Sequence, residues 1–374
     1  MLQNNNRLLK AASHYQYGQA AFNINTISQA KALIEIHEML RAPLIIQVAD
    51  LGLGFLGGQQ EFKQSTLKDK EKGAQIIAYA VKEMAEKSPI PIALHLDHGS
   101  SFETCKAAID NGFTSVMFDG SHFDYEENVR LTRQVVDYAH PRGVSVEGEL
   151  GILAGVEDDV FSETSTYTNP LQALDFIKRT NVDSLAISYG TTHGPNKGKN
   201  VSLRTEIVIA ISELLRHEQK FCSIVSHGSS TIPEYIVSAI NHLGGEIEGA
   251  GGIARSVLQE TIVAGVNKIN VDTDLRLAMM RNFWELLKHK AEITDVRVKA
   301  MLEKIEENPK EVDPRRVMAT IMDYAMTNQI DSEDLAKIND CMTQGVKEIV
   351  AQLIVSFEMV GKAEKVVALE NANK

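Results

Sequence analysis

Short apolar runs rich in β-branched residues alternate with longer segments of helical periodicity along most of this chain. Runs that lack a polar alternation are typical of strands buried on both faces, as in a parallel sheet. Eight such runs precede residue 272. The predicted strands cover residues 20–25, 43–49, 91–97, 115–119, 144–149, 184–188, 222–226 and 266–271.

Most of these strands are followed by a predicted helix. Ser28 is expected to cap the first of them, which runs through Arg41, and Asn169 to cap a later one. A loop is expected at residues 52–58, where four glycines gather. The predicted helices cover residues 28–41, 69–87, 102–111, 126–140, 169–179, 203–218 and 233–243.

Eight strand–helix units predict an α/β fold, a single (β/α)8 TIM barrel over residues 1–285. An open, doubly wound sheet is the alternative, although no GxGxxG follows the first strand. From Leu275 onward the pattern is almost entirely helical. We expect residues 286–374 to form a C-terminal helical extension, either an oligomerisation arm of a homodimer or homotetramer, or a lid. A plain solvated extension is the other interpretation.

Charge and cysteine content narrow the class of protein. A formal net charge of −12 argues against binding to nucleic acid or to an anionic membrane surface. The three cysteines form no CxxC pair, so neither a disulfide framework nor a thiolate zinc site is indicated. No apolar core of a signal peptide and no run long enough to span a membrane is present in the sequence. A cytoplasmic protein is expected.

Three histidines share one context, since each follows a predicted strand and precedes a glycine. They are His98, His193 and His227. In a parallel barrel the carboxyl ends of all strands open on one face, so the three imidazoles can converge there. Three imidazoles with an open position suit a catalytic Zn²⁺. Any one of them alone would be better explained as structural, but the shared context favours a metal site. Glu149, also at a strand end, is a candidate ligand or orienting partner.

Two carboxylates are candidate acid–base groups. Asp97 adjoins His98 and is placed to exchange a hydroxyl proton. Glu157 lies on the polar loop after Glu149, where a carboxylate can work on a C–H proton, although the pattern alone favours a solvated acidic loop. A route without a metal would need a Schiff-base lysine at a strand end. Lys268 is the one lysine within the eight predicted strands, and that route is disfavoured.

Phosphate-binding features follow strands six, seven and eight. The segments 194–197, 228–230 and 270–273 offer backbone N–H groups, hydroxyls and one lysine. Phosphate sites of barrels commonly form near strands seven and eight. Asp272 is expected to hold donors or substrate hydroxyls.

Together these motifs resemble the class II, metal-dependent fructose-bisphosphate aldolases, over about residues 18–285. The motifs that carry the resemblance are Ala-Phe-Asn-Ile (21–24), His-Leu-Asp-His-Gly-Ser-Ser (95–101), Asp-Gly-Ser (119–121), Glu-Leu-Gly (149–151) with Glu157-Asp-Asp, Thr-His-Gly-Pro-Asn-Lys (192–197), His-Gly-Ser-Ser (227–230) and Asn-Val-Asp-Thr-Asp (270–274). Residues 244–247 and 268–278 are most similar to the subgroup found beside Calvin-cycle genes in bacteria.

The resemblance implies a role for each of these residues. His98, His193 and His227 would be zinc ligands, with Glu149 and Asp119 at an alternative or second metal position. Asp97 would exchange the C4 hydroxyl proton of the substrate, and Glu157 the C3 proton of dihydroxyacetone phosphate. Asn270 would contact the substrate and its enediolate. The implied phosphate pocket, often accompanied by a monovalent cation, consists of Gly194, Lys197, Gly228, Ser230, Asp272 and Thr273.

The sequence departs from the family pattern at several positions, and these departures bear on which sugar phosphate is bound. Ala49-Asp50 stands where the family usually has a serine, and Asn196 where it usually has an aromatic residue. The arginine for the distal phosphate has three candidates, which are Arg276, Arg281 and Arg315. The alternatives to fructose 1,6-bisphosphate are tagatose 1,6-bisphosphate and sedoheptulose 1,7-bisphosphate. A non-catalytic sugar-phosphate-binding paralogue is the alternative from another class.

Overall fold

A computed structural model describes residues 2–153, 155–157, 160–162, 166–194 and 202–372, with the backbone alone described for 155–157, 160–162 and 370–372. Eight parallel strands close into a barrel in the order β1-β10-β9-β8-β5-β4-β3-β2, which confirms the predicted fold class. The strands are β1 Gln19–Asn23, β2 Leu44–Ala49, β3 Ile92–Gly99, β4 Ser115–Phe118, β5 Ser145–Leu150, β8 Ser184–Ile187, β9 Ser223–Ser226 and β10 Val266–Val271.

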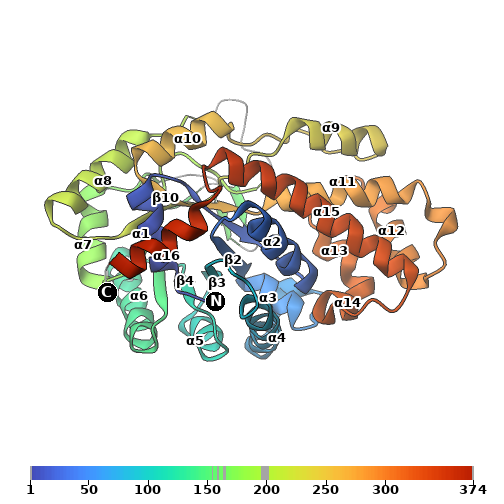
Figure 1. Cartoon of the computed structure of the whole chain (residues 1–374), viewed down its shortest axis with the longest axis horizontal. Coiled ribbons are helices and arrows are strands. Elements are labelled where there is room, and N and C mark those ends of the chain that lie inside the picture. Colours follow the sequence, from blue (N-terminus) through green and yellow to red (C-terminus); the bar gives the residue numbers. More distant parts are fainter. Residues whose placement is uncertain (1, 154, 158–159, 163–165, 195–201, 373–374) are drawn as a thin grey trace.

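Helices surround the barrel (Figure 1). They leave the barrel strands buried on both faces, which explains the continuous apolar runs in the sequence. The helices that follow barrel strands are α2 Ile27–Leu40, α3 Asp50–Leu56, α4 Leu67–Ala85, α5 Phe102–Asp110, α6 Tyr125–Ala139, α7 Pro170–Thr180, α8 Thr205–His217, α9 Glu234–Leu243, α10 Arg255–Ala264 and α11 Thr273–Leu287.

The prediction of a glycine-rich loop after the second strand is wrong, because residues 50–56 form the buried helix α3. The glycines let α3 approach α4 closely. A Cβ built on Gly73 would lie 1.9 Å from the carbonyl oxygen of Leu53, and one on Gly57 2.0 Å from that of Asp69. The prediction that Ser28 caps the helix after the first strand is also wrong. Thr26 caps α2 and accepts a hydrogen bond from the backbone of Gln29.

Two further helices lie outside the predicted pattern. Helix α10 occupies the connection between α9 and β10. Helix α1, Asn5–Tyr15, contacts β1, β9 and β10. Its backbone N–H at Asn5 donates to Ser145 Oγ (3.1 Å), at the start of β5, so α1 covers the end of the barrel where the strands begin.

The C-terminal helices are packed onto the barrel. They are α12 Val296–Glu307, α13 Pro314–Met318, α14 Met322–Thr327, α15 Glu333–Ser356 and α16 Lys362–Ala372. Helix α15 lies against α2 and α11, and α16 lies against α1 (Figure 1). One hydrophobic cluster includes Leu33 of α2, Met280 of α11 and Ile349 of α15. The boundary at residue 285 falls within α11, and the roles of arm and lid stay predictions.

The remaining elements are short. The loop after β5 carries an antiparallel pair, β6 Gly155–Glu157 and β7 Val160–Ser162. The 3-10 turns are η1 Phe62–Gln64, η2 His140–Arg142, η3 Lys290–Glu292 and η4 Ala319–Ile321. Among the described residues, we find no helix with the length and apolar character needed to cross a membrane.

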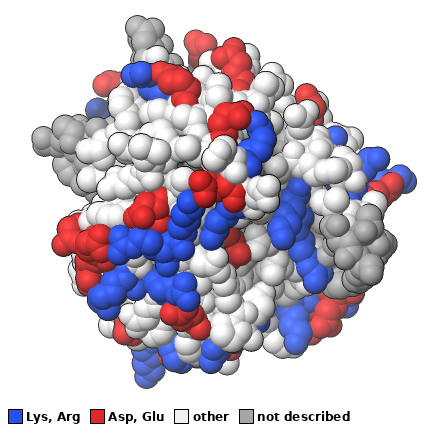
Figure 2. Space-filling view, turned by 90° about the vertical axis from the view of Figure 1, so that its left-hand side faces the viewer, with Lys and Arg blue, Asp and Glu red and all other residues white. Residues whose placement is uncertain are grey.

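Charges of both signs are interspersed on the face that carries α7 and α8 (Figure 2). Many of them are paired. Lys178 of α7 contacts Glu218 (2.6 Å), and Arg216 of α8 contacts Glu213 (2.5 Å). The charge on this face is therefore mixed rather than uniformly basic.

Candidate active site and metal centre

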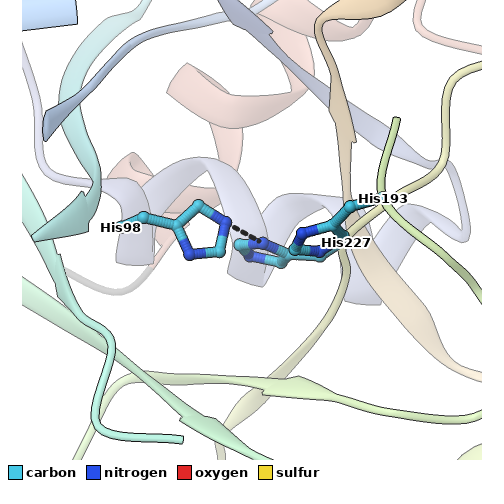
Figure 3. A group of neighbouring side chains, drawn as sticks. All are labelled: His98, His193 and His227. Atoms are coloured by element: carbon cyan, nitrogen blue, oxygen red, sulfur yellow. Dashed lines mark hydrogen bonds between the residues drawn. The ribbon is translucent and has the colours of Figure 1, made fainter. Parts of the chain in front are cut away.

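The three predicted histidines come together at the carboxyl ends of the strands (Figure 3). His98 is the last residue but one of β3, while His193 and His227 follow β8 and β9. The ring centroids lie 4.6 Å apart for His98 and His227, 5.5 Å for His98 and His193, and 6.3 Å for His193 and His227. Each ring offers one nitrogen within 4.8 Å of the other two. The convergence predicted from three strand exits is thus present.

The backbone at His98 is unusual. Its φ of 48° lies in the left-handed region, which costs energy for any residue other than glycine. The pairing of β3 with β4 shifts register between Leu96 and Gly99, so the strand is irregular where it meets the site. Next to this irregularity, the His98 ring faces His227, with its Nε2 2.9 Å from Nδ1 of His227.

Two carboxylates approach the other nitrogen of His98. Nδ1 lies 2.9 Å from Asp119 Oδ2 and 3.8 Å from Glu149 Oε2. His98, Asp119 and Glu149 form a second group whose donor atoms lie within 4.8 Å of one another. Burial alone would raise the pKa of Asp119, but hydrogen bonds from His98 and Ser121 hold that pKa below its usual range.

The donors present fit a divalent cation. Three imidazoles are a set that zinc prefers, and a mixed imidazole–carboxylate group accepts zinc or a harder divalent ion. Both groups are almost wholly buried, and carboxylates in such a place call for a compensating positive charge. His98 belongs to both groups, so it would be the ligand that the two metal positions share.

Asp97 lies next to this centre and is fully buried. Asn23 Nδ2 donates to its Oδ2 (2.8 Å), and Asn270 Nδ2 donates to its Oδ1 (3.1 Å). The two amides come from β1 and β10, which flank the closing seam of the barrel. Both carboxylate oxygens are therefore held in place, as an acid–base group requires. Asn23 belongs to a quoted motif, but no role was predicted for it.

A buried ion pair supports the metal centre from below. Glu147 Oε1 lies 2.9 Å from Nε2 of His227, and Glu147 Oε2 accepts from Lys268 Nζ at 2.9 Å. Burial would raise the pKa of Glu147, yet the nearby Lys268 charge and the His227 hydrogen bond hold that pKa below its usual range. Lys268 also lies 3.3 Å from His95 Nε2 and has no exposed surface. The disfavoured Schiff-base route through Lys268 stays a prediction.

Sequence reasoning missed Glu147 and His95, and assigned no supporting role to Lys268. A signal was present in the two-residue spacing of strands, which places residues i and i+2 on one face. Glu147, Lys268 and His95 stand two residues before Glu149, Asn270 and Asp97, respectively. They form the inward-facing layer beneath the predicted site.

The predicted phosphate residues gather beside the histidines. Ser230 Oγ accepts from the backbone N–H groups of Thr273 (3.1 Å) and Asp272 (3.4 Å), where α11 begins. A cavity of about 200 Å³ is lined by His193 and Asn270 together with Gly194, Gly228, Ser230, Asp272 and Thr273. Gly228 has a φ of +59°, and a Cβ there would lie 2.4 Å from the carbonyl oxygen of Thr192. Lys197 lies outside the described residues.

Two of the three candidate arginines line the same cavity. Arg276 contacts Asp272 (2.8 Å) and Asp313 (3.2 Å). Arg315 of α13 pairs with Asp313 and lies 4.2 Å from the ring centroid of Phe62. Arg281 instead donates to Glu348 of α15 (2.8 Å). The C-terminal segment thus contributes to the cavity next to the metal centre.

For Glu157, the structure describes the backbone alone. The segment expected to be a polar loop instead contains the pair β6–β7, and Glu157 lies opposite Val160 in it. The side chain of Glu157 is outside the described structure, so its role stays a prediction.

A closed parallel barrel with histidines, carboxylates and a phosphate-type cavity at its strand ends defines a barrel enzyme of the metal-dependent kind. The chain belongs to the class-II fructose-bisphosphate aldolase family, because the sequence model of that family matches residues 3–362. It is therefore an enzyme of the lyase class, as its predicted family requires.

Comparison with individual proteins agrees with this assignment. A fructose-bisphosphate aldolase of Thermus caldophilus is 36% identical over 314 residues, covering 83% of this chain and 90% of that protein. One of Treponema pallidum is 40% identical over 296 residues, covering 75% and 85%. Among solved structures, the YdjI aldolase of Escherichia coli K12 is similar with a TM-score of 0.64 and 26% identity, covering 97% of this chain and 100% of that one.

Proposed function

We propose that this chain is a zinc-dependent aldolase that reversibly cleaves fructose 1,6-bisphosphate into dihydroxyacetone phosphate and glyceraldehyde 3-phosphate. The observation that carries the proposal is the convergence of His98, His193 and His227 beside a carboxylate, Asp97, that is buried and held by two amides. Its membership of the family and the names of its relatives support the substrate.

The proposed roles of the side chains follow from their chemistry. A bound Zn²⁺ would be held by the three histidines and would supply Lewis-acid stabilisation of the negative charge that cleavage creates. Asp97 takes the proton of the C4 hydroxyl, the C3–C4 bond breaks, and the aldehyde forms. Glu157 returns a proton to C3 to complete dihydroxyacetone phosphate. Asn270, which donates to Asp97, contacts the substrate beside the cleaved bond.

The phosphates are assigned to two parts of the cavity. Gly194, Lys197, Gly228, Ser230 and Thr273 would hold one phosphate, with Asp272 orienting donors or a monovalent cation. Arg276 and Arg315 would hold the distal phosphate, because both line the cavity.

Substrate preference is the finer question, because Ala49-Asp50 replaces the usual serine. A serine there would offer a hydroxyl donor, whereas the Asp50 carboxylate only accepts, and it is bound by Lys70 and by Ser100 Oγ (3.1 Å). A preference for tagatose 1,6-bisphosphate or sedoheptulose 1,7-bisphosphate is the second candidate.

The test is a panel of the three ketose bisphosphates, with triose or tetrose phosphate release measured before and after chelation. We expect fructose 1,6-bisphosphate to give the highest kcat/KM, loss of activity on chelation, and recovery with Zn²⁺ or Co²⁺. Failure of all three substrates with zinc-loaded protein would refute the proposal. Activity that resists chelation and is trapped by borohydride would instead indicate a Schiff base. A second divalent ion at the Asp119–Glu149 group, a homodimer or homotetramer, and a cytoplasmic location remain parts of the proposal.

A further inference from the structure

A continuous chain of buried polar contacts runs beneath the metal centre. It connects His227 to Glu147 (2.9 Å), Glu147 to Lys268 (2.9 Å), and Lys268 to His95 (3.3 Å). None of these four side chains has any exposed surface. Glu147, Lys268 and His95 come from β5, β10 and β3, which are not neighbours in the sheet, so the contacts among them cross the interior of the barrel.

A buried ion pair of this kind is a weak source of stability. Removing two charges from water costs about as much as their attraction returns, and apolar residues of similar volume often serve equally well. Stability alone therefore gives little reason to place Glu147 and Lys268 in the barrel core. Their contact with a candidate metal ligand suggests another reason.

The two oxygens of Glu147 have different partners. Oε2 accepts from the Lys268 ammonium, while Oε1 faces Nε2 of His227. A carboxylate only accepts, so the proton of the His227 ring must lie on Nε2. The lone pair of the ring is then on Nδ1, which is the nitrogen that faces His98 Nε2 at 2.9 Å. The other nearby donor at Nε2 is the Asn270 amide (3.2 Å), whose Nδ2 is already directed at Asp97.

The far end of the contact chain is also held. Ser115 Oγ lies 2.8 Å from Nδ1 of His95, and Asn5 Nδ2 lies 3.3 Å from the same nitrogen. Asn5 belongs to α1, the helix that covers the opening at the start of the strands. His95, which contacts Lys268, is thus held from below by residues outside both ligand groups.

We propose that Glu147, held by Lys268, is a positioning residue that fixes the tautomer and orientation of His227 so that Nδ1 points at the metal ion. This inference rests on the proposed function, because it requires a divalent ion at the three histidines. Carboxylates that orient a ligating histidine in this way are typical of zinc centres, and their loss weakens metal binding by about 10- to 100-fold.

The test separates positioning from stability by comparing Glu147→Gln with the double variant Glu147→Met/Lys268→Met. The double variant leaves no unpaired buried charge, so it should fold even where the single variant does not. Zinc affinity is measured by competition with a chromophoric chelator, ligand geometry by the visible absorption spectrum of the Co²⁺-loaded protein, and stability by thermal unfolding of the metal-free protein.

We expect the double variant to unfold near the wild-type temperature, to bind Zn²⁺ about 10- to 100-fold more weakly, and to show an altered Co²⁺ spectrum. Asp334→Asn is the matched control. Asp334 is a buried carboxylate of α15 that accepts from the backbone of Thr294 and Asp295, away from the metal centre. Its loss should reduce stability and leave zinc affinity unchanged.

Wild-type zinc affinity and an unaltered Co²⁺ spectrum in the double variant would overturn the inference and leave the proposed function standing. A wild-type protein that binds no divalent ion would instead overturn the proposed function, and the inference with it.

Discussion

At the scale of single residues, Asp97 carries the sharpest expectation. Replacing it by asparagine preserves the shape of the side chain but removes the acid–base group, so kcat should fall by about 10²- to 10⁴-fold. Zinc content, measured by atomic absorption, should not change, because Asp97 belongs to neither ligand group. Asp110→Asn, on the surface of α5, is the control and should retain full activity.

Unchanged turnover in Asp97→Asn would show that Asp97 is not the acid–base group. A large loss of bound zinc in that variant would instead show that Asp97 is a ligand, contrary to the geometry.

How far the site could be predicted from sequence depended on how deep each residue lies in the barrel. His98, His193 and His227 stand at strand ends next to glycines, and such local patterns are visible along a chain. Glu147 and Lys268 lie within strands, where an apolar residue is the usual occupant and where no turn marks them. Their importance comes from contacts between strands far apart in sequence, which only the closed barrel brings about.

At the scale of elements, the crossing of α3 and α4 is the most restrictive packing contact. Alanine at Gly73 would place a Cβ 1.9 Å from a backbone oxygen of Leu53, so the two helices must move apart. We expect a loss of about 1–3 kcal/mol in the free energy of unfolding, despite the roughly 1 kcal/mol by which alanine is favoured in a helix. Urea unfolding measures it. The exposed Glu71→Ala on the same helix is the control, and equal stability of Gly73→Ala would contradict the close crossing.

The same crossing explains why α3 could not be predicted. Four glycines within residues 50–58 predict a loop from intrinsic preference, whereas packing against α4 makes a helix of residues 50–56. Where preference and packing agreed, the prediction was accurate. Asn169 caps α7 as expected, since its side chain accepts from Leu171 and Gln172.

At the scale of the whole molecule, α15 is part of the core of the barrel domain. Ile349 is fully buried in the cluster shared with α2 and α11, so Ile349→Ala should reduce the free energy of unfolding by about 2–5 kcal/mol. Val355→Ala, on the exposed face of the same helix, should change it by less than about 0.5 kcal/mol. Denaturant unfolding followed by tryptophan fluorescence is suitable, because Trp284 lies in α11. Equal effects of the two variants would mean that α15 is a detachable arm.

Acid should weaken the attachment of the C-terminal segment. Burial would raise the pKa of Asp313, but Arg276 and Arg315 hold it below its usual range. A lowered folded-state pKa contributes stability that is present above the unfolded pKa of about 3.9 and is lost as pH falls below it. Asp313→Asn should therefore be less stable than wild type at pH 7, with the difference shrinking below about pH 4. Thermal unfolding from pH 7 to pH 3 checks this, with the exposed Asp137→Asn as control. A difference independent of pH would contradict the ion pairing.

The seam between β1 and β10 has a consequence for how the chain is made. Gln19 pairs with Lys268, so β1, which pairs with β2 early, lacks its second neighbour until β10 leaves the ribosome about 250 residues later. At roughly 5–20 residues per second, that delay is about 12–50 s. Until then, Asp97 lacks the hydrogen bond from Asn270, and the Glu147–Lys268 pair does not exist. Assembly of the catalytic centre is therefore a late event, which cannot precede the synthesis of β10.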